Sequence, residues 1–366
     1  MRAVVVASCV VVALAGQPKP SDVYQSAIAK YVAGDLDAAS DALAGLTQAD
    51  IQKAIETSVQ TIQGRGGSPA ARRRLEAIAL LHTEYTLATE LPPKDVLFHI
   101  HMAQLSLAVS RRTLTGQVPD TDEAEMRRVR AFLPQWHALA ASALLTCYAD
   151  QEALTLVEDG LKLFPENEEL LFWRGLVLEF HAVWVGTPTI DPHAALPAIR
   201  NRDPTGFDLL TNTRVWAPVE EAYRRVLQRG SNNAETHLHL GYALYSLRRY
   251  GDARTEYELA RDSSTDPFVV YVGDLLLGRL KEDQNDLKGA VADYERAVAK
   301  LPGAQSAYVG LGSAEARLGN AQRAREVTEQ FATIPDRQRV RDPWWLYRTT
   351  RVPVGDLASL RKAVRQ

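Results

Sequence analysis

Apolar residues recur every three or four positions along almost the whole chain, which is the spacing of one face of an amphipathic α-helix. Short breaks rich in Gly, Pro, Asn or Asp separate these segments, and alternating strand patterns are scarce. The pattern predicts an all-α protein with amphipathic helices at 69–90, 93–112 and 121–133. From 134 to 336 it predicts a series of helix pairs.

The C-terminal half contains an internal repeat. Gly278 and Gly312 are 34 residues apart, and so are Ala290 and Ala324. A small residue on the first helix of each pair lets the second helix approach closely, where alanine and aromatic positions form the matching stripe. The three sets are Leu240-Gly241 with Ala253, Tyr257 and Ala260; Leu277-Gly278 with Ala290, Tyr294 and Ala297; and Leu311-Gly312 with Ala324 and Phe331.

This spacing resembles the tetratricopeptide repeat, whose pattern is W-x2-L-G-x2-Y followed by A-x3-F-x2-A-x4-P. The resemblance is specific over 216–336, weaker over 134–181 and weakest before 120, where 24–43 looks like one degenerate unit. It implies a right-handed superhelical solenoid of antiparallel helix pairs, and among its members the chain looks like an exported bacterial-type protein.

Two segments depart from the pattern. In the middle unit Asp274 and Lys281 occupy aromatic positions, and Ala253 and Ala290 are 37 residues apart. Its first helix is in register either at Gly278 or at Gly273 with a longer turn around 281–286. Upstream, the unit that begins near 168 continues only at 216, so we expect an insertion over 182–216 whose prolines exclude long helices.

By analogy with the family, the first helices line a concave groove that binds a peptide segment or a protein partner. The candidate groove residues lie beside the Leu-Gly pair of each unit, and aromatic side chains among them would be good anchors. The alternative is that several pack against an adjacent helix or the insertion. The candidates are Phe172, Trp173, Glu179, Leu238, His239, Tyr242, Tyr245 and Arg279, with Leu176 and Leu275 beside them.

The insertion either covers the groove, adds a partner contact or packs on the convex side. The alternative function also depends on this insertion. In that case the protein is an enzyme or metal-binding protein, and residues 182–216 complete its site. The residues that would have to meet there are His181, Asp191, His193 and Asp203, which no ligand spacing selects.

The N-terminus predicts export. An apolar run from Ala3 to Ala15 follows Arg2 and ends in a small-x-small pattern, as in a signal peptide over 1–15. A lipid anchor at Cys9 is the alternative. The other cysteine, Cys147, lies in an apolar pattern and is expected to be buried. We expect a periplasmic or secreted protein with no transmembrane helix after cleavage.

The last segment, 337–366, contains eight Lys or Arg, two Asp and the aromatic run Trp344-Trp345-Leu346-Tyr347. One interpretation is a cap that folds back over the exposed apolar end of the solenoid. The other is a basic aromatic patch that contacts an anionic membrane surface or a partner. The chain thus divides into 1–15, a helical region at 16–133, repeats at 134–336 and this tail.

Composition narrows the function only by exclusion. The 366 residues carry a formal net charge of -3, with 46% hydrophobic and 24% charged residues, which excludes a disordered chain and a strongly basic nucleic-acid binder. No nucleotide or hydrolase motif is present. We therefore expect a non-enzymatic interaction scaffold without cofactor or metal that binds a peptide segment or protein partner in the cell envelope. A structural module of a larger envelope assembly is a further interpretation.

Overall fold

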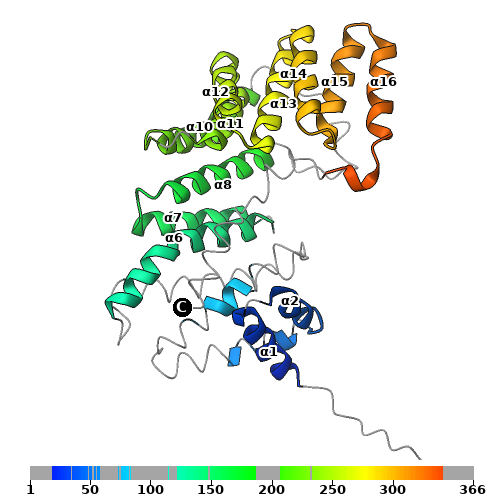
Figure 1. The fold of residues 1–366 in the computed structure, drawn as a ribbon. Helices are drawn as coiled ribbons and strands as arrows, with labels where there is room; N and C mark the ends of the chain where they lie inside the picture. The colour runs from blue at the N-terminus through cyan, green and yellow to red at the C-terminus, as the bar shows by residue number, and fades with distance from the viewer. Residues whose placement is uncertain are drawn as a thin grey trace, which may run out of the picture.

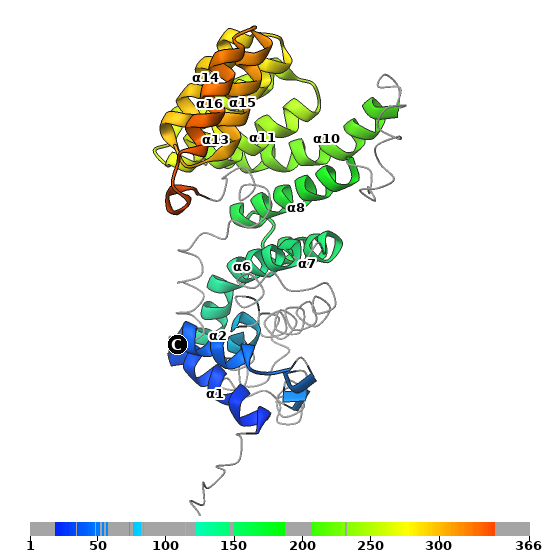
Figure 2. The same ribbon diagram turned by 90° about the vertical axis from the view of Figure 1, so that its right-hand side faces the viewer.

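The computed structural model describes residues 19–33, 35–47, 122–146, 149–186, 207–230 and 233–340, with single residues and short stretches between 49 and 83 and residue 114. Every regular element in these ranges is a helix. The helices form a curved stack in which α1 and α2 lie at one end and α15 and α16 at the other (Figure 1; Figure 2). This is the all-α solenoid of antiparallel helix pairs that the sequence predicts.

The stack begins with a helix pair where the sequence shows a degenerate unit. Helix α1 spans Pro20–Ala33 and α2 spans Leu36–Ala44. Asp35 caps α2 by accepting a hydrogen bond from the backbone N–H of Ala38 at 3.1 Å. Ala27 and Ala39 are both fully buried, so the two helices approach closely through small residues.

The next pair corrects one predicted boundary. Helix α6 spans Glu123–Thr146 and α7 spans Asp150–Leu163. The expected division between 133 and 134 therefore falls inside α6, because Pro134 bends the helix without ending it (Figure 1). The pair is fixed by buried His137, whose Nδ1 lies 2.7 Å from the carbonyl oxygen of Leu156 on α7.

The third pair consists of two long helices. Helix α8 spans Glu168–Gly186 and α10 spans Phe207–Leu227, and they pack against each other. The prediction that 182–216 contains no long helix was wrong at both ends, because α8 extends four residues past 182 and α10 begins at 207. Residues 187–206 lie outside the described part of the chain.

Three regular pairs complete the stack. Their bounds are Ala234–Ser246 and Tyr250–Ser263 for α11 and α12, Pro267–Asp283 and Leu287–Lys300 for α13 and α14, and Gln305–Arg317 and Ala321–Ala332 for α15 and α16. A short 3₁₀ helix, η1, follows at Asp336–Gln338. Side chains cap several starts; Asp266, for example, accepts from the N–H of Phe268 at 2.9 Å.

The turns within these pairs have one geometry. Each connection has three residues, and its middle residue is left-handed: φ is 60° at Arg248, 63° at Asn285 and 86° at Gly319. The turn at 284–286 is therefore not lengthened. The extra length of the middle unit comes instead from α13, in which Gly278 is the twelfth residue, whereas Gly241 and Gly312 are the eighth of their helices. Four residues are added there, and the loop at 264–266 is one residue shorter than the loop at 301–304, which leaves a net gain of three.

The glycines of the Leu-Gly pairs fix this register. A Cβ atom on Gly241 would lie 2.6 Å from the ring of Tyr257, and one on Gly278 would lie 2.7 Å from the ring of Tyr294. Gly175 faces Tyr223 in the same way, at 2.4 Å, across the long α8–α10 pair. These contacts identify Gly278, rather than Gly273, as the repeat glycine of the middle unit.

Two hydrophobic clusters meet in helix α8. Trp173, Val177 and Phe180 belong to the cluster of α1, α2, α6 and α7, whereas Ala182 belongs to the cluster that extends from α10 to α16. Because α8 contributes buried side chains to both clusters, it joins the two parts of the stack. Within the described ranges, no helix is long and apolar enough to cross a membrane. The predicted signal segment 1–15 lies outside those ranges.

Candidate functional site: a groove between α13 and α15

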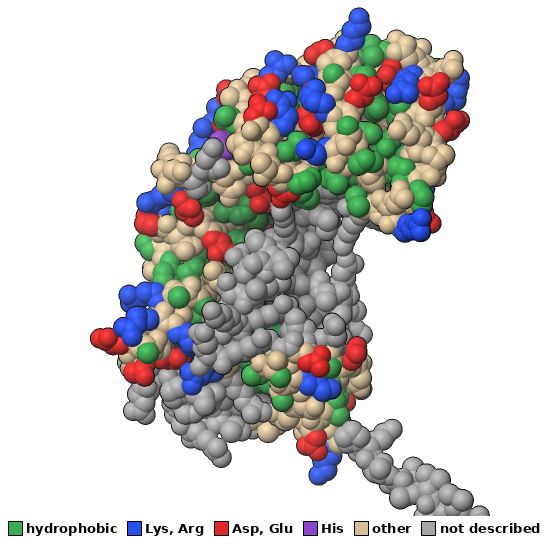
Figure 3. Space-filling view, viewed as in Figure 1, with side chains coloured by type: hydrophobic (Ala, Val, Ile, Leu, Met, Phe, Trp, Pro, Cys, Tyr) green, Lys and Arg blue, Asp and Glu red, His purple; other side chains and the backbone are tan. Residues whose placement is uncertain are grey.

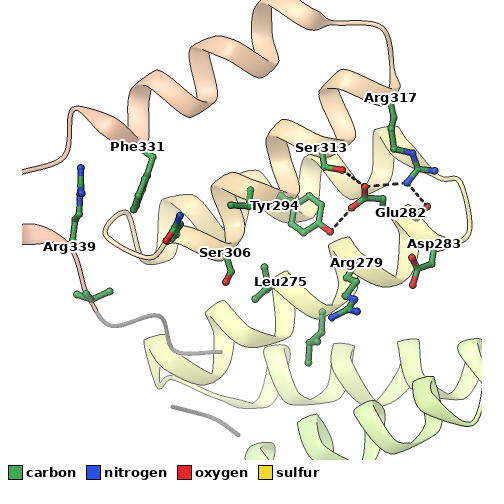
Figure 4. A pocket seen from close by; sticks show the side chains of 15 residues that line it. Leu275, Arg279, Glu282, Asp283, Tyr294, Ser306, Ser313, Arg317, Phe331 and Arg339 are labelled. Carbon is green, nitrogen blue, oxygen red and sulfur yellow. Dashed lines mark hydrogen bonds and ion pairs between the residues drawn. The ribbon is translucent and has the colours of Figure 1, made fainter. Parts of the chain in front are cut away.

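A groove of about 920 Å³ lies between the first helices of the last two pairs, α13 and α15. Residues from α14, α16 and the segment after η1 complete it (Figure 4). In the space-filling view, hydrophobic side chains lie along the side of α13–α16 that faces the hollow of the molecule (Figure 3). The first helices supply this surface because the second helices lie behind them in the stack.

The floor of the groove is apolar. Leu275 on α13, Val309 on α15, Phe331 on α16 and Val340 after η1 line it. Val309 is 62% exposed and Val340 is 44% exposed. Four large hydrophobic side chains of the described residues are exposed, and two of them lie here.

One rim carries a carboxylate that the protein holds in place. Glu282 on α13 accepts hydrogen bonds from the hydroxyls of Tyr294 and Ser313 at 2.9 and 2.7 Å, and Arg317 pairs with it at 3.2 Å (Figure 4). Burial and the neighbouring carboxylate raise the pKa of the Tyr294 hydroxyl, which therefore stays a donor at neutral pH. This network joins α13, α14 and α15 and fixes the width of the groove.

The other rim leads toward helix α11. The Tyr245 hydroxyl donates a hydrogen bond to the carboxylate of Asp283, and the guanidinium of Arg279 lies 5.8 Å from the centre of the Tyr245 ring. Burial and the bond to Asp283 raise the pKa of Tyr245. Both Arg279 and Asp283 are exposed, so this rim presents one cation and one anion to solvent.

The structure places the predicted groove residues in two groups. Tyr245 and Arg279 lie at the rim described above, and Leu275 lies on the floor. Phe172 is partly buried, with its ring 5.5 Å from that of His239. The remaining five are buried between helices: Trp173, Glu179, Leu238, His239 and Tyr242.

The buried group forms a polar centre between α8, α10 and α11. Glu179 accepts a hydrogen bond from the hydroxyl of Tyr223 at 2.7 Å, and its carboxylate lies 2.7 Å from Nδ1 of His239. Trp216 packs edge-on against Tyr242 at 5.4 Å between ring centres. These side chains hold the three helices together. This is the packing role that the sequence analysis gave as the alternative to groove binding.

Most residues of the groove were not predicted, and they include Ser306, Val309, Ser313, Arg317 and Phe331. A usable signal was present for three of these five. Val309, Ser313 and Arg317 follow Leu275, Arg279 and Asp283 by one repeat length of 34 residues. The segment after η1 carried no such signal, because it lies beyond the last repeat.

The described residues do not bring together the four residues named for the alternative metal or catalytic site. His181 faces α7, where its Nδ1 lies 2.5 Å from the carboxylate of Asp150. Asp191, His193 and Asp203 lie outside the described ranges. Among the residues that the structure does describe, no group of three or more His, Cys, Asp or Glu could hold a metal ion.

The fold and the groove define a helical-repeat scaffold, and the comparisons with known proteins name the repeat. Residues 220–267 and 275–335 match the sequence model of the tetratricopeptide repeat family. The resemblance found in the sequence is thereby confirmed over these residues, and it supports a protein-interaction scaffold. No curated protein sequence matches the chain.

Three solved structures are similar to the chain at low identity. A crystal structure of MamA has 17% identity and a TM-score of 0.39, covering 52% of this chain and 92% of its own. A monomeric mutant of IFIT1 with Gppp-AAAA has 12% identity and a TM-score of 0.37, covering 81% and 70%. Yeast Tom70 has 13% identity and a TM-score of 0.19, covering 94% of each chain.

Proposed function

We propose that the protein is a non-enzymatic scaffold that binds a peptide segment or protein partner in the groove between α13 and α15. The observation that carries the proposal is the exposed apolar floor, above all Val309 at 62% exposure, between rims that hydrogen bonds and ion pairs hold in place. An apolar centre with a polar rim is the usual anatomy of an interface.

The groove suits an extended or helical segment rather than a small reactant. Its carboxylates are engaged by Tyr294, Ser313 and Arg317 on one rim and by Tyr245 on the other. An apolar side chain of the partner would enter between Leu275 and Val309, and its backbone would pass the rims. We place this partner in the cell envelope, because the sequence at 1–15 favours export.

The test is affinity capture from the native envelope with the full chain as bait. Val309→Glu places a charge on the floor of the groove and should abolish capture of the specific partner. Leu259→Glu is the matched control, because Leu259 is a similarly exposed apolar residue on α12, at 45% exposure, outside the groove. Equal capture by both folded variants would refute the proposal.

Trp173 and Tyr242 are unsuitable for this test, although the sequence points to them. Trp173 is 4% exposed and Tyr242 is 9% exposed, so substitution would leave cavities of core size in the stack. A loss of partner binding in such variants would not separate recognition from unfolding.

A further inference from the structure

The outer surface of α16, the last α-helix of the described residues, is polar and does not need to be covered. Helix α16 has a single buried residue, Val327, and the face that points away from α15 is polar. Its exposed side chains include Gln322, Arg325, Glu326 and Glu329. A stack that ends in such a helix is already capped. The aromatic run at 344–347, which lies outside the described ranges, would therefore find no apolar end to cover there.

Exposed apolar surface lies instead in the groove between α13 and α15, where the chain returns after α16. The N–H of Val340 donates a hydrogen bond to the carbonyl of Gly303, in the loop before α15, at 3.1 Å. The guanidinium of Arg339 lies over the ring of Phe331 at 5.1 Å. These contacts hold Val340, the last residue of the described range, among the residues that line the groove.

The sequence that follows Val340 fits an apolar groove. It reads Arg341-Asp342-Pro343-Trp344-Trp345-Leu346-Tyr347, with four consecutive large apolar or aromatic residues that begin four positions later. Proline restricts the residue before it to extended backbone, the form in which a short segment enters a groove. An extended chain covers about 3.3–3.6 Å per residue, so Trp345 reaches up to about 17 Å from Val340.

We propose that residues 342–347 occupy the groove as an internal ligand. A tethered segment acts at an effective concentration in the millimolar range, so even weak apolar contacts suffice to hold it there. An external partner would then have to displace it, and this last step alone rests on the proposed function. Occupancy itself requires no partner and is testable without one.

Disulfide trapping in the full chain tests the occupancy. Cys9 and Cys147 are replaced by alanine, and Leu346→Cys is combined either with Val309→Cys in the groove or with Glu326→Cys on the outer face of α16. Both helix positions are exposed. Under mild oxidation we expect the groove pair to close about tenfold faster or more than the α16 pair. Faster closure at Glu326 would overturn the proposal in favour of a cap over the end of the stack.

A second variant separates docking from random motion of the tether. Trp344→Ser with Trp345→Ser, added to the groove pair, should slow closure about tenfold, because the aromatic contacts hold the segment in place. Unchanged closure would show that the tether alone brings the cysteines together and would overturn the proposal. Circular dichroism melts establish that each variant is folded. A failure here would leave partner binding at the groove untouched.

Discussion

At the scale of single residues, the repeat depends on close approach between a glycine and a tyrosine. The sequence predicts this contact from the Leu-Gly pair and the aromatic position, and the structure confirms it at Gly241 with Tyr257 and at Gly278 with Tyr294. Tyr257 is fully buried and cannot turn away from an added methyl group. The glycine is needed for space, because it lies within a helix where its flexibility is a disadvantage.

Gly241→Ala should lower the free energy of unfolding by about 1–2 kcal/mol, because overpacking against Tyr257 outweighs the better helix propensity of alanine. Gly251→Ala is the matched control, since a Cβ atom there would meet nothing within 4 Å. It should be neutral or slightly stabilising. Urea denaturation measures both variants, and equal effects would contradict the role assigned to Gly241.

Which residues would be open to a partner was harder to predict than which would be helical. Leu238, His239 and Tyr242 share the helix face of the groove positions, but α8 and α10 pack over them. The residue type at a single position does not show whether other helices pack over that face of a first helix. Val309 and Ser313 occupy the equivalent face of α15 and remain in the groove.

At the scale of elements, the three C-terminal pairs share one turn, and the sequence could not locate the extra residues of the middle unit. Lengthening the turn or the helix leaves the apolar stripes in place, so periodicity does not decide between them. The part of helix Phe207–Leu227 that precedes 216 was missed for another reason. It includes Thr211, Asn212 and Thr213, which have poor helix propensity, and the helix as a whole packs against α8.

The shared turn predicts opposite effects at two equivalent positions. Arg248 is left-handed at φ 60°, and its exposed side chain is outside the core, so Arg248→Gly should raise stability by about 0.5–1 kcal/mol. Gly319, at φ 86°, has open space around it, so Gly319→Ala should cost about 1 kcal/mol through backbone strain alone. Thermal denaturation checks both; changes of the same sign would contradict the common geometry.

The departures from the repeat pattern in the middle unit form an ion network. Lys281 pairs with Asp293 at 2.8 Å, and Arg296 pairs with Asp293 and, at 3.0 Å, with Asp274. Burial raises the pKa of Asp274, which Arg296 partly offsets. Charged residues therefore replace the aromatic packing of the other units and join α13 to α14.

Removing the centre of this network should be costly. Asp293 is fully buried, and Asp293→Ala would leave Lys281, which is 19% exposed, without its partner. We expect a loss of about 2–3 kcal/mol, below the cost of a fully buried pair because Lys281 and Arg296 retain some access to water. Asp262→Ala, which breaks an exposed pair with Arg261, should cost less than about 1 kcal/mol. Equal losses in chemical denaturation would refute a structural role for the network.

At the scale of the whole molecule, the stack is two hydrophobic clusters joined through α8, with an open groove near its C-terminal end. The solenoid could be predicted because its 34-residue period is local and repeated. The groove could be predicted only as a side of the solenoid. Its actual place depends on which first helices lack a neighbour, and that is a property of the assembled stack.

The central claim is that the groove between α13 and α15 is the binding surface. The most direct measurement is calorimetric titration of the captured partner with the full chain, with Val309→Glu and with Leu259→Glu. We predict that Kd rises at least about tenfold for Val309→Glu, which corresponds to about 1.4 kcal/mol, and stays unchanged for Leu259→Glu. An unchanged Kd for folded Val309→Glu would contradict the claim.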